Sequence, residues 1–199
     1  MIRKTKIAIF ASASGSNTQK VVEYFANNKY IEVALILCNN KAAYVLERAK
    51  KLNVKALVVE KKDFNNETIV PELLKEHDIN FIVLAGFFLM IPTYLLKLFN
   101  KKIVNVHPSL LPKFGGKGFY GSNVHKAVIT AKEKISGITI HYVDEGLDTG
   151  EIIFQKKYVL KHDETHESLC ENITQLEHKY YPIVIEKILR GNIRNECEL

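Results

Sequence analysis

The chain has 199 residues, which fits one domain or at most two small ones, and 47% of them are apolar, enough to fill a core. Charged residues make up 25% of the chain, so a globally disordered protein is excluded. The net charge of +6 comes from lysines scattered in pairs outside any aromatic-rich motif, which favours a lysine-rich surface or small anionic ligands over nucleic acid.

The first half of the chain alternates short apolar strands with helices. Strands are expected at residues 6–10, 33–38, 55–59, 81–84 and 103–106, and helices at residues 17–26, 44–52, 68–76 and 93–99. Near-continuous apolar strands that alternate with helices are typical of a parallel sheet covered on both faces.

The pattern changes after about Lys132. Residues 137–143 and 152–160 are strand-like, and the short, turn-rich connection between them indicates local or antiparallel pairing. Residues 165–189 have the apolar spacing of one long helix, which Pro182 is expected to bend. The whole chain is therefore predicted to form one α/β domain with a modified C-terminal part.

The cysteines and the apolar runs indicate in which cellular compartment the protein is expected. Cys38, Cys170 and Cys197 form no CxxC pair, are odd in number and are typical of free thiols in a reducing cytosol. The longest apolar run, residues 81–91, falls short of the roughly 20 residues that cross a bilayer. The N-terminal apolar segment is shorter than the roughly seven to fifteen residues of a signal peptide's core. We expect a cytoplasmic protein with neither a metal nor a membrane partner.

Ligands of parallel sheets bind beyond the carboxyl ends of the strands. The loop after the first strand, ASASGSNTQ at residues 11–19, leads into a helix whose free N–H groups could hold a phosphate. Ser16 or Asn17 could instead simply cap that helix. The loop is neither GxGxxG nor a P-loop, so a monophosphate fits it better than a dinucleotide.

The fifth strand ends in NVHPSLLP, where Asn105 and His107 face the same way because side chains alternate along a strand. An amide can donate to a developing oxyanion, and an imidazole can move a proton near neutral pH. A lone histidine is more often structural, but this pair precedes a proline-stiffened loop. Asp148, in the turn at residues 144–150, could pack inward and favour the imidazolium form of His107.

The chain has a further apolar segment, VLAGFFLMI at residues 83–91. The default interpretation of such a run is that it is part of the hydrophobic core. Gly86 nevertheless interrupts the end of the fourth strand, and Phe88, Leu89 and Met90 follow it. Such a segment could form an apolar slot for a flat heterocycle.

Together these segments resemble the monofunctional phosphoribosylglycinamide formyltransferases of purine biosynthesis, which use 10-formyltetrahydrofolate. The resemblance spans nearly the whole chain. Its HPSLLP block marks the wider formyltransferase superfamily, and the GSN loop without a further domain points to this member. The matching segments are residues 15–17, 84–87, 105–112, 147–148, 177–178 and 181–182.

The resemblance implies a role for each matching residue. The catalytic trio would be Asn105, His107 and Asp148. Binding of the ribonucleotide would involve Gly15, Ser16, Asn17, Thr18, Gln19, Gly86 and Glu177. Folate would contact Phe88, Leu89, Met90, Ile91, Asn105, Val143, Asp144 and Asp148, with no metal involved.

The family's fold is a Rossmann-like, mostly parallel twisted sheet with helices on both faces and a long C-terminal helix. Residues 1–199 would be a single formyltransferase domain, with the ribonucleotide phosphate held by about residues 1–100 and the catalytic and folate-binding half at about residues 101–199. The partners would be small-molecule substrates, with no nucleic acid or membrane, in a monomer or homodimer. The substrate's amine would attack the formyl carbon directly, with the oxyanion stabilised by Asn105 and protonated His107 and a proton relayed by Asp148.

Two segments depart from the family pattern. Residues 114–128 are longer and richer in glycine than the Pro-Gly and histidine-containing stretch of many members. At residues 64–67 the chain reads FNNE, without the arginine that some members carry there, so no folate contact is predicted at that place.

Three alternatives stay open. Methionyl-tRNA formyltransferases share the folate half but usually add a C-terminal domain, whereas ten residues follow Leu189 here. Formyltetrahydrofolate deformylases normally carry an N-terminal regulatory domain. A non-catalytic nucleotide-phosphate binding module would leave the grouping of Asn105, His107 and Asp148 unexplained.

Overall fold

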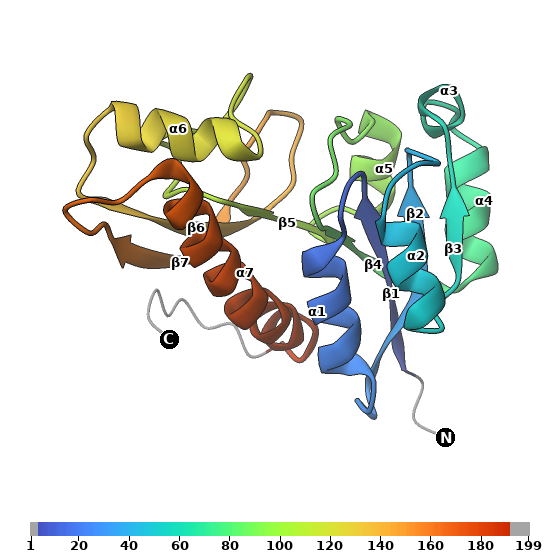
Figure 1. Ribbon diagram of the computed structural model, residues 1–199. Coiled ribbons are helices and arrows are strands. Elements are labelled where there is room, and N and C mark those ends of the chain that lie inside the picture. Colours follow the sequence, from blue (N-terminus) through green and yellow to red (C-terminus); the bar gives the residue numbers. More distant parts are fainter. Residues whose placement is uncertain (1–3, 192–199) are drawn as a thin grey trace. The chain divides into compact units, whose positions relative to one another are not determined.

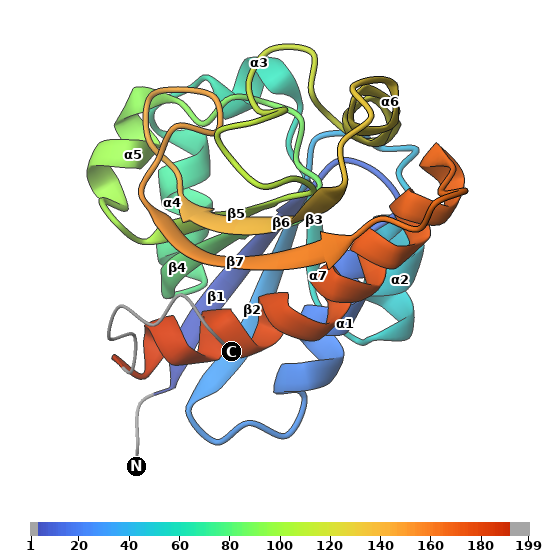
Figure 2. The same ribbon diagram turned by 90° about the vertical axis from the view of Figure 1, so that its left-hand side faces the viewer.

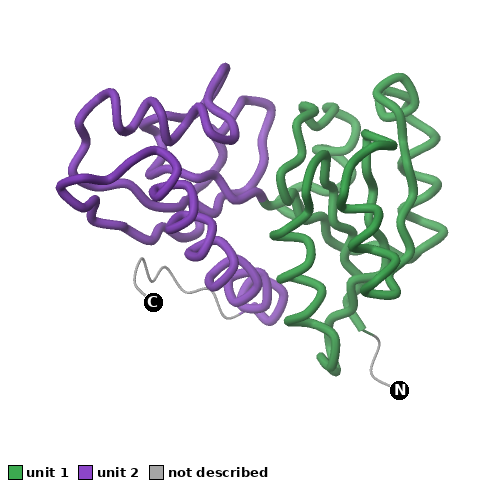
Figure 3. The backbone as a smooth tube through the Cα atoms, in the orientation of Figure 1, with its two compact units in different colours: residues 1–104 green, residues 105–199 purple. Residues whose placement is uncertain are grey.

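The computed structural model describes residues 4–191. The chain forms two compact units, which meet in sequence between Val104 and Asn105 (Figure 3). The strand β5 (Ile103–His107) runs through this boundary, so its first residues belong to one unit and its last residues to the other.

The first unit is a parallel α/β structure. Its strands are β1 (Thr5–Ala11), β2 (Ile31–Cys38), β3 (Ala56–Val58), β4 (Ile79–Leu84) and the beginning of β5; its helices are α1 (Ser16–Phe25), α2 (Val45–Lys51), α3 (Lys61–Phe64), α4 (Ile69–Glu76) and α5 (Thr93–Leu98). β1 pairs in parallel with β2 and with β4, and β2 pairs in parallel with β3. α1 and α2 lie side by side along these strands (Figure 1).

Burial explains why these strands are apolar. Residues 7–11 of β1 are completely buried, as expected of a central strand whose two faces are both covered. α1 turns Val21, Val22 and Phe25 inward, at the three- and four-residue spacing of one helix face. Further along, the rings of Phe10 and Phe64 pack edge to face, with centroids 5.8 Å apart.

The second unit contains the rest of β5, α6 (Ser122–Thr130), β6 (Ile135–Tyr142), β7 (Ile152–Val159) and α7 (His166–Leu189). β6 and β7 pair antiparallel, with Ile135 opposite Val159. α7 packs against this pair and against α6 (Figure 2). It starts with a capping box between Thr165 and Ser168 and continues as a helix through Pro182.

The strands lie in the order β3-β2-β1-β4-β5-β6-β7. The prediction of a mostly parallel, Rossmann-like sheet with helices and a long C-terminal helix is confirmed. The antiparallel pairing after Lys132 is also confirmed. The sequence analysis missed α3 and α6. α6 lies largely within residues 114–128. The glycines in the first half of that segment suggested only a loop.

Two remaining expectations concern thiols and membranes. Cys38 and Cys170 are free thiols, and Cys197 lies outside the described residues. Within residues 4–191, no helix is both long and apolar enough to cross a bilayer.

Candidate active site

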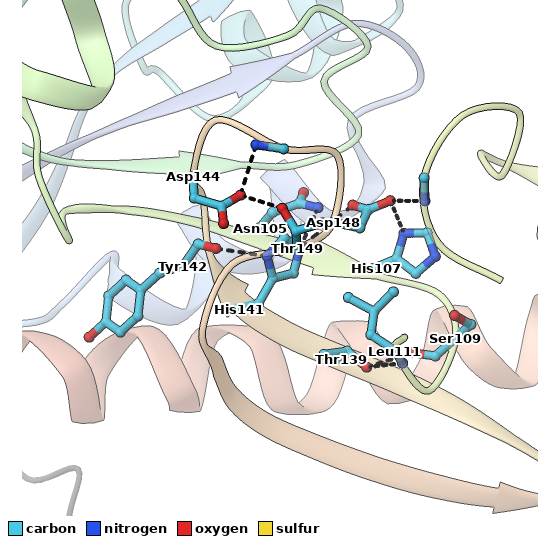
Figure 4. A network of polar contacts seen from close by, with 12 residues as sticks. Asn105, His107, Ser109, Leu111, Thr139, His141, Tyr142, Asp144, Asp148 and Thr149 are labelled. Carbon is cyan, nitrogen blue, oxygen red and sulfur yellow. Dashed lines mark hydrogen bonds and ion pairs between the residues drawn. The ribbon is translucent and has the colours of Figure 1, made fainter. Parts of the chain in front are cut away.

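The end of β5 supplies two polar side chains to the second unit. His107 is 4% exposed and Asn105 is half-buried, while Val106 between them is buried on the other face of the strand. Figure 4 shows the Asn105 amide and the His107 ring approaching the loop between β6 and β7, which carries Asp148.

Asp148 lies at the centre of this group. Its Oδ2 atom is 3.4 Å from Nδ1 of His107 and accepts a 3.0 Å hydrogen bond from the backbone N–H of Gly116. Its Oδ1 atom is 3.6 Å from Nε2 of His141. The residue has φ 58°, a left-handed conformation that aspartate tolerates better than most residues. The structure thus brings the three predicted catalytic residues together.

The surroundings of Asp148 favour its ionised form. Burial by itself would raise the pKa of this carboxyl. The neighbouring imidazole of His141, the hydrogen bond from the Gly116 N–H and the nearby His107 outweigh burial and hold the pKa below its usual value. Asp148 is therefore a carboxylate at neutral pH and can accept a proton.

The turn before Asp148 is shaped by Asp144. Its Oδ1 atom accepts hydrogen bonds from the Gly146 N–H at 3.1 Å and from the Thr149 hydroxyl at 2.7 Å. A Cβ atom on Gly150 would lie 1.8 Å from the carbonyl oxygen of Tyr142, so only glycine fits there. This oxygen of Asp144, a predicted folate contact, is thus engaged in its own turn. Val143, a second predicted contact, is half-buried where the turn begins.

His141, which the sequence analysis did not single out, completes the group. It lies on β6 and is 2% exposed. Its Nδ1 is 2.8 Å from the Tyr142 carbonyl oxygen, and its Nε2 is 3.2 Å from Nδ2 of Asn105. If Nδ1–H donates to that carbonyl, Nε2 of the neutral ring can accept from the Asn105 amide. The available signal was an imidazole near the end of a predicted strand, just before the acidic turn.

His107 is held at both ring nitrogens. Nε2 is 2.7 Å from the carbonyl oxygen of Phe114, to which it can donate, and Nδ1 faces Asp148. Burial lowers the pKa of His107 and outweighs the opposite effects of the Asp148 charge and of the bond to Phe114, so this pKa lies below its ordinary value. The ring is therefore oriented by a backbone carbonyl on one side and by a carboxylate on the other.

A buried hydrogen-bond network fixes the loop that carries Phe114. The Thr139 hydroxyl donates to the Ser109 carbonyl at 2.7 Å and accepts from the Leu111 N–H at 3.0 Å (Figure 4). The side-chain amide of Gln155 donates to the Leu111 carbonyl at 3.0 Å. The Ser109 hydroxyl then donates to the Lys113 carbonyl at 2.7 Å. β6 and β7 thus hold the segment that orients His107.

The loop after β1 lies in the first unit. Gly15 has φ 75° and precedes α1, and a Cβ atom at this position would lie 2.4 Å from Cγ2 of Val45. Thr18 is completely buried. Ser16, Asn17 and Gln19 are half-buried.

The segment after β4 contacts the loop after β1. The Ser12 N–H donates to the Gly86 carbonyl at 2.9 Å, and the Ser12 hydroxyl accepts from the Phe88 N–H at 2.9 Å. Phe88 and Met90 are 59% and 57% exposed, so two large apolar side chains are available at this edge. Leu89 is half-buried and Ile91 is buried.

Glu177, on α7 in the second unit, is 9% exposed. The described residues contain no group of three or more histidine, cysteine or acidic side chains arranged to hold a metal ion. The polar side chains gathered around Asp148 are the amide of Asn105 and the imidazoles of His107 and His141.

The chain was compared with known proteins. The model of the formyl transferase family matches residues 5–185. Phosphoribosylglycinamide formyltransferase of Bacillus subtilis is 39% identical over 196 residues, which cover 96% of this chain and 98% of that protein. The chloroplastic enzyme of the same name from Arabidopsis thaliana is 36% identical, over 96% of this chain and 68% of the relative.

Solved structures with similar names share the fold. Phosphoribosylglycinamide formyltransferase from Anaplasma phagocytophilum superposes with a TM-score of 0.87 at 31% identity, over 96% of this chain and 90% of that chain. Glycinamide ribonucleotide transformylase 1 from Geobacillus kaustophilus superposes with a TM-score of 0.85 at 38% identity, over 94% of this chain and 100% of that chain.

Proposed function

The chain belongs to the formyl transferase family, and we propose that it transfers the formyl group of 10-formyltetrahydrofolate to the glycinamide amine of N1-(5-phosphoribosyl)glycinamide, a step of purine biosynthesis. The observation that carries this proposal is the position of Asp148, whose two oxygens face His107 and His141 beside Asn105. A carboxylate held among proton donors suits a reaction in which an amine loses a proton as it attacks a carbonyl.

The reaction begins with the neutral amine, whose lone pair forms a bond to the formyl carbon. The carbonyl electrons move to oxygen and give a tetrahedral oxyanion. The amine proton passes to the ionised Asp148, directly or through water. The oxyanion then re-forms the carbonyl, the bond from carbon to N10 of folate breaks, and that nitrogen takes up the proton. The products are the formylated amide and tetrahydrofolate.

Asn105 is the proposed oxyanion donor. A side-chain amide nitrogen has two N–H groups, and a bond to Nε2 of His141 uses one of them. The second N–H can donate to the oxyanion, an interaction worth about a hundredfold or more in rate. His141 thus orients the donor.

His107 acts mainly on Asp148 in this proposal. Its two ring nitrogens face the Phe114 carbonyl and the Asp148 carboxylate, so it has a ring N–H for the carboxylate only when protonated. The ring then orients the carboxylate that receives the amine proton. The hydrogen bond expected from protonated His107 to the oxyanion stays a prediction.

We assign each substrate to the residues that the resemblance predicts for it. The ribonucleotide phosphate goes to the loop of Gly15, Ser16, Asn17, Thr18 and Gln19, with Gly86 and Glu177 as further ribonucleotide contacts. The folate goes to residues 88–91 and to residues 143–148, where the exposed Phe88 and Met90 favour an apolar ring.

An acceptor comparison tests the proposal. The protein is mixed with 10-formyltetrahydrofolate, and folate absorbance is followed with glycinamide ribonucleotide, with methionyl-tRNA and with water as the only acceptor. We expect turnover with the ribonucleotide alone. Turnover with methionyl-tRNA or with water would instead favour the tRNA formyltransferase or the deformylase. Binding of the ribonucleotide without any turnover would favour a non-catalytic module.

A further inference from the structure

Arg48 connects α2 to the loop after β1. Its Nε atom donates a 2.9 Å hydrogen bond to the carbonyl oxygen of Ser14, and its Nη1 atom donates to Oε1 of Gln19. The two partners lie on either side of Gly15 in sequence. A single side chain therefore bridges the approach to the loop and the first turn of α1.

Other contacts hold this bridge in place. The guanidinium carbon of Arg48 lies 5.1 Å from the centre of the Tyr44 ring, within the range of a cation–π contact. The side-chain nitrogen of Gln19 donates to Glu23 at 2.6 Å, so both ends of the Gln19 amide are engaged. The Val45 N–H donates to the Ala13 carbonyl at 3.2 Å. The loop thus rests on the start of α2 through several independent contacts.

The bond to Ser14 determines the direction of a neighbouring N–H. In a trans peptide the carbonyl of one residue and the N–H of the next lie in one plane and point in opposite directions. Because Arg48 holds the Ser14 carbonyl, the N–H of Gly15 points away from the guanidinium. The N–H groups at the start of a helix are the ones that bind phosphate, so their direction matters for affinity.

We propose that Arg48 is a positioning residue that presets residues 13–19 for the phosphate of the substrate and thereby sets the preference for a phosphorylated ligand. The proposal rests on the function proposed above. It assigns the effect to the two-point bridge rather than to positive charge alone. A lysine at position 48 keeps the charge but lacks the planar fork that bonds Ser14 and Gln19 together.

The test measures how much the substrate's phosphate contributes to kcat/KM. Initial rates are compared for glycinamide ribonucleotide and for the same compound without its phosphate, in the wild-type protein and in Arg48→Met, Arg48→Lys and Lys50→Met. Lys50 is the matched control because it lies on the same helix, its side chain is 75% exposed and it pairs with Glu47. Thermal melting of each variant shows whether it is folded. If Arg48→Met does not fold, the comparison of rates is made with Arg48→Lys.

We expect the wild-type protein to prefer the phosphorylated compound strongly. Both Arg48 variants should reduce this preference about tenfold, as expected when a charged hydrogen bond is lost. Their KM for the folate and their rate at saturating ribonucleotide should stay near the wild-type values, and Lys50→Met should keep the full preference.

Three results would overturn the proposal. An undiminished preference in Arg48→Met shows that the bridge is not needed. Full rescue by lysine shows that charge alone acts. If the KM for folate rises as much as the KM for the ribonucleotide in the Arg48 variants, the protein is damaged in general. The proposed function fails separately, if the wild-type protein formylates neither the phosphorylated nor the unphosphorylated compound.

Discussion

The Nε2 nitrogen of His107 lies 2.7 Å from the carbonyl oxygen of Phe114, and this contact leaves Nδ1 of the same ring facing Asp148. A backbone carbonyl thus selects the orientation of the imidazole, as backbone and carboxylate partners do for many functional histidines. The segment that carries Phe114 is the one that departs most from the family pattern in sequence. Its shape therefore bears directly on the chemistry.

Replacing His107 by alanine should lower kcat by about a hundredfold or more, because Asp148 loses the ring that orients its carboxylate. The change also removes the 2.7 Å bond from His107 to the Phe114 carbonyl, which keeps only a 3.5 Å bond from the Ser109 hydroxyl, at a cost of about 1 kcal/mol of stability. Steady-state kinetics and thermal melts are measured together. His125→Ala is the control, because this histidine of α6 is also buried, at 3% exposed. Equal kcat losses in the two variants would contradict a catalytic role for His107.

Replacing Asp148 by asparagine keeps the shape of the side chain and removes its charge. We expect kcat to fall by about a hundredfold or more, because the amide cannot take up the amine proton. The charge of Asp148 raises the pKa of His107, so that pKa should move further down in the variant. An NMR titration of the His107 ring measures the shift. An unchanged or higher value would show that the two side chains are not coupled.

His125 should make stability depend on pH. Burial lowers the pKa of this ring from 6.5 to about 4. The unfolded chain then binds a proton more readily than the folded protein, so stability is lost as the pH falls from about 6.5 towards 4. The loss can reach about 3 kcal/mol. Urea melts at several pH values test this, and His125→Gln should flatten the dependence. An equal slope in the variant would assign it to other groups.

Replacing Gly15 by alanine should disturb the loop after β1 in two ways, through its φ of 75° and through a Cβ atom 2.4 Å from Val45. We expect the KM for the ribonucleotide to rise at least about tenfold while the folate KM changes little. Gly191→Ala is the control, because Gly191 has φ 69° and a Cβ atom there would meet nothing within 4 Å. If the two KM values rise together, the loop does not serve the ribonucleotide in particular.

The strands and the grouping of Asn105, His107 and Asp148 could be predicted from the sequence because they follow from local patterns. Asn105 and His107 interrupt an apolar strand at its carboxyl end, and ligand sites of parallel sheets lie there. Asp148 stood out because it is an acid between a leucine and a Thr-Gly pair in a glycine-rich turn. These signals need only residue type and spacing.

The remaining parts of the site could not be predicted because they depend on tertiary contacts. Two partners in the site are backbone groups, the Phe114 carbonyl and the Gly116 N–H. Because such groups occur along the whole chain, nothing in the sequence distinguishes these two. His141 looked like an ordinary histidine of a buried strand. Arg48 is separated from Ser14 by 34 residues, and only the fold brings them together.

The most direct measurement follows the formyl carbon itself. The protein is given 10-formyltetrahydrofolate with an isotope-labelled formyl carbon together with glycinamide ribonucleotide, and the products are read by NMR. The account predicts that the label appears in an amide on the glycinamide nitrogen, at a rate that Asp148→Asn reduces by about a hundredfold or more. Label recovered as free formate, or label that stays on the folate, would contradict it.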